Sequence, residues 1–348
     1  MMEHKVGWEA LRAYCMSLLK TQGLEEDSAY TVADCLVDAD LCGVESHGVS
    51  RMGIYLERLE KGAVQAKGDM KILSEYAGCM AYSAQNIMGM VAGKAAMQSC
   101  IEKARISGAC VSTVRNSNHF GMASYYARMA ADAGMIGFAT TNAPPNIAPW
   151  GSSQPFLGTN PIAISAPTHG EPIILDMAPS VVAMGKVILA AKLGKSIPEG
   201  WAITADGRPT TDPSEGMKGS VLPIGGPKGY GIALFVDILC GILSGAGYGP
   251  HLNNMWNDFA NPQGIGHFFM AIDIEKLMDL ELFRSRLECM VREIKELPKQ
   301  EGVEEIFMPG EIENRRRNKG KKDGIVLSEV VYNELQDLGR KYCVAFTL

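Results

Sequence analysis

From about residue 75 onwards, the chain alternates short apolar runs with longer stretches of helical periodicity. The runs have the length of buried strands, and the periodic stretches have the length of helices. The predicted strands are 109–115, 135–141, 161–166, 172–176 and 268–273. The predicted helices are 89–106, 122–133, 180–193, 229–243 and 274–296, and the Gly-, Pro-, Asp- and Thr-rich segment 204–226 is predicted to be loop. The alternation predicts an α/β or α+β region.

The first sixty or so residues follow the helical period throughout. One helix is predicted from Trp8 to a stop at Gly23, a second from about Glu25 to Gly43, and a third from after Ser46 to near Gly62. After Leu297 a polar link leads to a charged tail that ends in a helix over 327–338. The predicted fold class is therefore α+β / α/β, with a mainly helical domain over 1–74 and 300–348 and an α/β domain over 75–299.

Composition excludes several classes of protein. The 33 Lys and Arg residues against 39 Asp and Glu residues give a net charge of -6, which argues against a nucleic-acid partner. The nine cysteines form no C-x-x-C pair, so neither a metal site nor a disulfide framework is predicted. The N-terminus lacks a signal-peptide pattern, and the longest apolar stretch, 232–243, is too short to span a membrane and is interpreted as a buried helix. A cytoplasmic protein is the expectation.

Two common nucleotide-binding motifs are missing. The spacing G-x-G-x-x-G fails at Gly229 and at Gly247, because Leu234 and Leu252 stand where the third glycine is required. The P-loop pattern fails before Gly194-Lys195-Ser196, because Leu189 replaces its first glycine. Any nucleotide must therefore be bound by another architecture.

Ser46, His47 and Arg51 form the first candidate site. With Ser46 as helix N-cap, His47 and Arg51 lie four residues apart and share a helix face. An arginine fork suits a carboxylate, and an imidazole exchanges a proton near neutral pH. The alternative is an ordinary capped helix start with a surface His and Arg.

Four further segments are candidates for ligand binding, each with a structural alternative. The segment 115–121 contains Asn118 and His119 before a predicted helix, and either lines a cleft or caps the helix. The proline-rich loop 141–151 with 158–161 is either a site wall or a packed connector. Lys228 in the glycine-rich turn 225–231 either pairs with a phosphate or faces water, and the basic run 315–322 is expected to be a solvated surface segment.

Eight segments together resemble the malate/L-lactate dehydrogenase family of the non-Rossmann type, which includes dehydrogenases of ureidoglycolate and sulfolactate and reductases of cyclic imines. They are 43–51 (GVESHGVSR), 117–121 (SNHFG), 148–151 (APWG), 157–161 (LGTNP), 175–178 (LDMA), 209–213 (PTTDP), 228–231 (KGYG) and 308–311 (MPGE). The resemblance covers nearly the whole chain in order. It implies a homodimeric oxidoreductase that uses NAD or NADP, with NAD favoured, on a small 2-oxo or 2-hydroxy acid.

The resemblance also implies roles for individual residues. His47, in the helical domain, would donate the proton in reduction, Ser46 would orient it, and His119 is the second candidate. Arg51 and Thr159 would hold the substrate carboxylate. The cofactor, in a non-Rossmann nicotinamide-binding sheet domain, would be lined by His119, Phe120, Gly121, Met122, Ala123, Asp176, Met177, Ala178, Lys228, Gly229, Pro309, Gly310 and Glu311.

Two positions depart from the family pattern. Met184 stands where many members have an arginine near the cofactor, and Ala143 stands where ureidoglycolate enzymes have a serine. The second departure disfavours ureidoglycolate as substrate. A different class, a Schiff-base enzyme with Lys228 as nucleophile, has no other support in the sequence.

Overall fold

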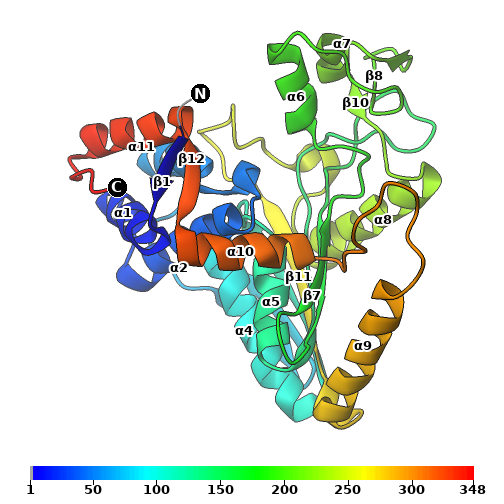
Figure 1. Cartoon of the computed structure of the whole chain (residues 1–348). Coiled ribbons are helices and arrows are strands. Elements are labelled where there is room, and N and C mark those ends of the chain that lie inside the picture. Colours follow the sequence, from blue (N-terminus) through cyan, green and yellow to red (C-terminus); the bar gives the residue numbers. More distant parts are fainter. Residues whose placement is uncertain (1–2) are drawn as a thin grey trace.

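A mixed seven-stranded sheet forms the centre of the computed structural model, which describes residues 3–348 (Figure 1). Its strands, in spatial order, are β2 (Lys71–Tyr76), β3 (Cys79–Ser83), β4 (Ala109–Ser117), β11 (Ile265–Asp273), β5 (Met135–Thr141), β6 (Ile162–Ala166) and β7 (Ile173–Met177). Only β3 and β4 run parallel to each other, and the other neighbours are antiparallel. All five predicted strands are present. The predicted α+β / α/β class is confirmed.

Two helices cover one face of the sheet. They are α4 (Gly89–Ser107) and α5 (Ser124–Asp132), which pack on β4, β5, β6 and β11. The helices approach closely because Gly93 of α4 lies against the Tyr126 ring, where a Cβ atom would be only 2.8 Å from the ring. Both helices were predicted, and their buried alanines and aromatic residues form one core with the inner face of the sheet.

The two ends of the chain come together in a mainly helical part. Its helices are α1 (Trp8–Thr21), α2 (Glu26–Leu41), α3 (Met52–Glu60), α10 (Glu311–Asp323) and α11 (Glu329–Tyr342). The strand β1 (Glu3–Val6) pairs with β12 (Ile325–Ser328), so the C-terminal helices return to the N-terminal ones (Figure 1). Ile325, Leu327 and Leu335 share a core with the residues of α1 to α3.

The sequence did not reveal β1, β2, β3 and β12. β1 and β12 have four residues each, and β2 is an edge strand whose six residues are all exposed. β1 and β2 carry no long apolar run, and the apolar runs of β3 (CMAY) and β12 (IVL) are too short to separate a strand from a helix or a loop.

The predicted loop 204–226 is wrong in part. It contains β9 (Pro209–Thr210), α7 (Pro213–Lys218) and β10 (Ser220–Val221), and the two strands pair on either side of β8 (Ala202–Ile203). Asp212 caps α7 by accepting a hydrogen bond from the Ser214 amide at 2.8 Å. Two-residue strands and a six-residue helix show no periodicity, which is why the turn-rich composition indicated loop.

Four predicted helices have different boundaries. The third N-terminal helix, α3, begins only at Met52, after two 3-10 turns, and the C-terminal helix α11 begins at Glu329 rather than at residue 327. The helix predicted over 180–193 is α6 (Met184–Lys192). The helix predicted over 274–296 is divided into η5 (Ile274–Lys276) and α9 (Leu280–Lys295), because Asp279 accepts a hydrogen bond from the Leu282 amide and so starts a new helix.

The apolar stretch 232–243 is not a buried helix. It lies in α8 (Pro227–Asp237) and the π-helical segment η3 (Ile238–Leu243). One face, with Val236 and Cys240, is buried, but Phe235 on the other face is 65% exposed. Within residues 3–348, no helix is both long enough and apolar enough to cross a membrane.

Candidate active site

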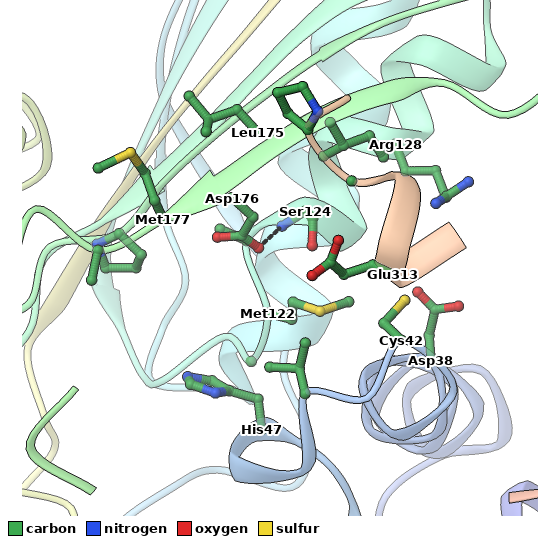
Figure 2. Close-up of a pocket in the computed structure, with 18 of the residues that line it drawn as sticks. Asp38, Cys42, His47, Met122, Ser124, Arg128, Leu175, Asp176, Met177 and Glu313 are labelled. Carbon is green, nitrogen blue, oxygen red and sulfur yellow. Dashed lines mark hydrogen bonds between the residues drawn. The ribbon is translucent and has the colours of Figure 1, made fainter. Parts of the chain in front are cut away.

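A cavity of about 370 Å³ lies where the helical part meets the edge of the sheet. Figure 2 shows His47 on one side of it, and Asp38, Cys42, Arg128 and Glu313 on the other. The lining comes from α2, the turn at His47, the start of α5, β7 and the start of α10. Its size is that of a pocket for a small molecule.

Ten of the predicted site residues line this cavity. They are His47, Gly121, Met122, Ala123, Thr159, Asp176, Met177, Ala178, Pro309 and Gly310. They come from five segments of the chain and meet only through the tertiary fold. Ser46 and His119 lie directly beside His47, whereas Lys228 and Glu311 lie elsewhere.

His47 and Arg51 are held by two consecutive 3-10 turns, η1 (Glu45–His47) and η2 (Val49–Arg51). The interpretation of Ser46 as a helix N-cap is therefore wrong, because its hydroxyl lies 3.0 Å from His47 Nδ1 instead of capping a helix. Asp40 anchors the turns by accepting a hydrogen bond from the Val49 amide at 2.8 Å. Gly48 permits this approach, since a Cβ atom there would lie 1.9 Å from the Asp40 carboxylate.

Arg51 is fixed on two sides. Its Nε atom donates a hydrogen bond of 2.6 Å to the Ser46 carbonyl, and its guanidinium carbon lies 4.4 Å from the centre of the Trp256 ring. The terminal nitrogens of the fork thus remain available for the planar oxygens of a carboxylate.

The His47 imidazole is neutral near pH 7. Burial, together with the positive charge of Arg51, lowers the pKa of His47 from 6.5 to about 4. Ser46 occupies Nδ1, so Nε2 is the nitrogen that can exchange a proton with a ligand in the cavity. A serine hydroxyl can donate or accept, and the Ser46 contact therefore persists in either protonation state.

His119 stacks beside His47, with ring centres 5.5 Å apart. Its Nδ1 accepts a hydrogen bond from the Gly121 amide at 3.3 Å and lies 2.6 Å from the Tyr55 hydroxyl. Burial and the charges of His47 and Arg51 lower the pKa of His119 well below its usual range. His119 is therefore a neutral ring whose Nδ1 is already engaged.

The sheet side of the cavity offers a carboxylate and a close backbone approach. Asp176 accepts a 2.8 Å hydrogen bond from the Ser124 amide, and burial raises the pKa of Asp176 (Figure 2). Gly310 has a φ of +80°, and a Cβ atom there would lie 2.7 Å from the Ile174 carbonyl. An acceptor beside apolar walls fits a nicotinamide ribose, whose hydroxyls are donors and whose base is flat and largely apolar.

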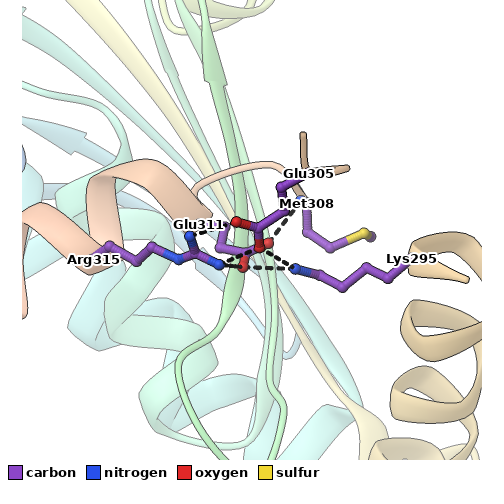
Figure 3. Close-up of polar contacts among 5 residues, drawn as sticks. All are labelled: Lys295, Glu305, Met308, Glu311 and Arg315. Carbon is purple, nitrogen blue, oxygen red and sulfur yellow. Dashed lines mark hydrogen bonds and ion pairs between the residues drawn. The ribbon is translucent and has the colours of Figure 1, made fainter. Parts of the chain in front are cut away.

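Glu311 lies outside the cavity, in an ion cluster (Figure 3). Its carboxylate contacts Lys295 and Arg315, both at 2.7 Å, and accepts a hydrogen bond from the Met308 amide at 3.0 Å. Glu305 completes the cluster through the same two cations. These contacts hold the 308–311 turn between α9 and α10, so Glu311 supports the lining residues rather than joining them.

The turn at Lys228 does not reach the cavity either. Lys228 is exposed at the start of α8, and the nucleophile of a Schiff-base enzyme has to be desolvated. Gly229 is buried, and a Cβ atom there would meet the Ile224 and Pro179 backbone. The placement of Lys228 gives no support to the Schiff-base alternative.

Sequence reasoning missed several residues around the cavity. Tyr55 was not among the predicted site residues, although it contacts His119 and follows Arg51 by four residues. Arg128 and Glu313 lie on helices without any motif. Only the Tyr55 spacing was a signal that could have been read, because the other residues arrive from distant segments.

Comparisons with a family model and with known proteins agree on the family to which this chain is similar. A family model described as Malate/L-lactate dehydrogenase matches residues 6–336. A malate dehydrogenase from Pyrococcus abyssi is 42% identical over 341 residues, which cover 96% of this chain and 93% of that protein. An L-sulfolactate dehydrogenase from Methanocaldococcus jannaschii is 40% identical and covers 93% of each chain.

The fold agrees as well. The crystal structure of malate dehydrogenase from Entamoeba histolytica superimposes with a TM-score of 0.95 at 31% identity and covers 100% of both chains. The names of other homologues specify ureidoglycolate with NAD(+) and (2R)-3-sulfolactate with NADP(+).

Proposed function

Because the chain belongs to the malate/L-lactate dehydrogenase family of oxidoreductases, we propose that it transfers a hydride between NAD(P)H and a 2-oxo acid to give a malate- or lactate-like 2-hydroxy acid. The observation that carries this proposal is the cavity lined by His47, Asp176 and Gly310, with Arg51 close enough to His47 to lower the pKa of that ring. A proton donor, a carboxylate-binding cation and a nucleotide cradle thus meet at one place. Ala143 continues to disfavour ureidoglycolate.

The bound nucleotide supplies the hydride, and the protein supplies position and charge. Asp176 and Met177 at the end of β7, the following Ala178, and Pro309 and Gly310 alongside the strand would hold the nicotinamide half. Gly121, Met122 and Ala123 close the cavity from the side of α5. Together these residues would orient the nicotinamide relative to the reacting carbon of the acid.

Arg51 binds the substrate carboxylate with its terminal nitrogens, and Thr159, which lines the cavity, is the second candidate for this contact. As negative charge grows on the carbonyl oxygen, His47 Nε2 donates a proton to it, and in oxidation the neutral ring accepts that proton. The carboxylate offsets the charge of Arg51, which is one cause of the low pKa of His47. Substrate binding therefore raises the pKa of His47, so that the ring can carry the proton needed for reduction of the 2-oxo acid. His119, with Nδ1 engaged by Tyr55, holds His47 in place.

The proposal is tested by following nicotinamide absorbance across a panel of 2-oxo acids, each with NADH and with NADPH. Oxidation with one acid at a kcat/KM well above its neighbours would establish the reaction, the substrate and the nucleotide. Failure of every acid, together with no binding of either nucleotide, would overturn the proposal. Nucleotide binding without turnover would direct the search to cyclic imines, which other family members reduce.

The low pKa of His47 predicts an unusual pH profile. Oxidation of the 2-hydroxy acid needs the neutral ring, which exists above the pKa, so kcat/KM should fall only as the pH drops toward about 4. Replacing Arg51 with Gln removes one cause of the lowering and should move this limb toward higher pH, where an ordinary histidine titrates. Initial rates measured between acidic and neutral pH for both proteins check this. A wild-type limb in the usual histidine range would contradict the assignment.

NAD is the favoured nucleotide in this proposal. Two cations at the cavity are already paired with carboxylates: Arg128, which lines it, pairs with Glu171 at 3.0 Å, and Arg317 pairs with the lining residue Asp38 at 2.5 Å. In the basic run 315–322, Arg315 belongs to the ion cluster with Glu311. A 2′-phosphate would have to compete with these carboxylates, whereas a 2′-hydroxyl would not.

The exposed face of α8 and η3 supports the homodimer that the family resemblance implies. A helix that is apolar all around is normally buried on every side. This one leaves a row of large apolar side chains uncovered within residues 3–348. They are Ile232, Phe235, Ile238, Ile242 and Leu243. A second copy of the chain would cover them across a two-fold axis.

Phe235→Asp is expected to convert the dimer into a monomer. It places a charge at the most exposed residue of the apolar row, where a self-complementary interface would bring two copies of the charge together. Sedimentation velocity at micromolar concentration measures the outcome. Lys228→Asp, a change on the exposed start of the same helix, is the control and should remain dimeric. A Phe235→Asp protein that sediments like the wild type would contradict the assignment of this face.

A further inference from the structure

The loop over residues 252–263, between η4 (Gly249–His251) and β11, is built around a buried arginine of another element. Arg58 of α3 is 1% exposed. Its guanidinium donates hydrogen bonds to the carbonyls of Met255 at 3.3 Å, Asp258 at 2.5 Å and Asn261 at 3.2 Å. Burying this cation is unfavourable unless hydrogen bonds compensate it, and the three carbonyls satisfy its terminal nitrogens while Nε is buried without a partner. The loop conformation and the burial of Arg58 therefore stabilise each other.

The same loop contacts two residues of the candidate site, Arg51 and His119. Trp256 lies over the Arg51 guanidinium at 4.4 Å. Gln263, at the end of the loop, accepts a 2.9 Å hydrogen bond from the His119 amide. Asn253 closes the base of the loop, since its amide donates to the Gln263 carbonyl at 3.0 Å and its side chain donates to the Pro262 carbonyl at 2.8 Å.

We propose that Trp256 and Arg58 are positioning residues for substrate binding, with Trp256 holding the Arg51 fork and Arg58 holding the loop that carries Trp256. The inference rests on the proposed function. The indole covers one flat face of the guanidinium, and the Ser46 carbonyl occupies Nε, so Arg51 presents its terminal N–H groups in a single orientation. Preorganising the fork in this way lowers the entropy lost when a carboxylate binds.

Trp256 is suited to a decisive test because it is 52% exposed and its removal leaves the core intact. Trp256→Ala should raise KM for the 2-oxo acid by about three- to thirtyfold, the effect of losing a cation–π contact. The kcat and the Kd for the nicotinamide nucleotide should change by less than about twofold, because Trp256 acts through Arg51 alone. Trp256→Phe keeps an aromatic face and should restore most of the affinity.

Phe259 provides the matched control. It belongs to the same loop and also lies under a cation, Lys61 at 4.1 Å, but it does not contact Arg51. Phe259→Ala should leave KM unchanged. Arg58→Lys, which keeps one charge but not three directed hydrogen bonds, should raise KM as Trp256→Ala does. The Trp256 result keeps the inference testable if the Arg58 variant does not fold.

A double-mutant cycle separates positioning from a general structural effect. If Trp256 works through Arg51, the KM penalty of Trp256→Ala should disappear in an Arg51→Gln background. Additive penalties, an unchanged KM in Trp256→Ala, or an equal rise in Phe259→Ala would each overturn the inference and leave the proposed function standing. A wild-type protein that turns over no 2-oxo acid would overturn the proposed function, and this inference with it.

Discussion

Replacing His47 with Ala should lower kcat by about 10²- to 10⁴-fold in both directions, the usual contribution of a positioned general acid or base. His47 lines the cavity, and Ser46 occupies its Nδ1 and leaves Nε2 to face the ligand. Since the side chain does not support the nucleotide cradle around Asp176 and Gly310, the Kd for NAD(P)H should stay within about twofold of the wild-type value.

Two further variants make this result specific. His251 is an exposed histidine, so His251→Ala should turn over at the wild-type rate. His119→Ala should be less impaired than His47→Ala, because His47 lines the cavity and His119 is not among its lining residues. An unchanged kcat in His47→Ala, or a larger loss in His119→Ala, would transfer the proton-exchanging role to His119.

Replacing Arg51 with Lys should raise KM for the 2-oxo acid by about ten- to a hundredfold, the equivalent of one lost charge-assisted hydrogen bond. Lysine keeps the positive charge but presents a single point instead of a planar fork. It also loses the hydrogen bond from Nε to the Ser46 carbonyl. Steady-state kinetics with the preferred acid measure the change.

The effect of Arg51→Lys should be confined to KM for the 2-oxo acid. The Kd for the nucleotide should not change, and kcat should fall by far less than in His47→Ala. Arg105→Lys, on the exposed surface of α4, is the matched control and should leave KM, kcat and the nucleotide Kd unchanged. Equal KM values for Arg51→Lys and the wild type would remove Arg51 from substrate binding and leave Thr159 as the remaining candidate.

The strongly patterned elements were predictable from sequence. The strand β5 and the helices α1, α2, α4 and α5 were each predicted to within about two residues, because buried runs and amphipathic periods extend through them. The short elements within 204–226 and the exposed strand β2 were not predictable. Their residues form local turns or face solvent, so they show no pattern of core-facing apolar residues. The exposed row on α8 was missed because composition cannot distinguish an apolar face that is covered within the chain from one that is not.

The sequence by itself determined the chemical types at the candidate site: an imidazole, an arginine and a carboxylate on β7. Only the tertiary structure decided which of them meet. It placed His47 on the cavity with Asp176, drew Glu311 into an ion cluster outside it, and brought Trp256 onto Arg51 from two hundred residues away. The physical reason is that a sequence motif reflects only the local backbone geometry of its own segment. Burial, and with it the pKa of His47, depends on distant segments that pack together only when the whole chain folds.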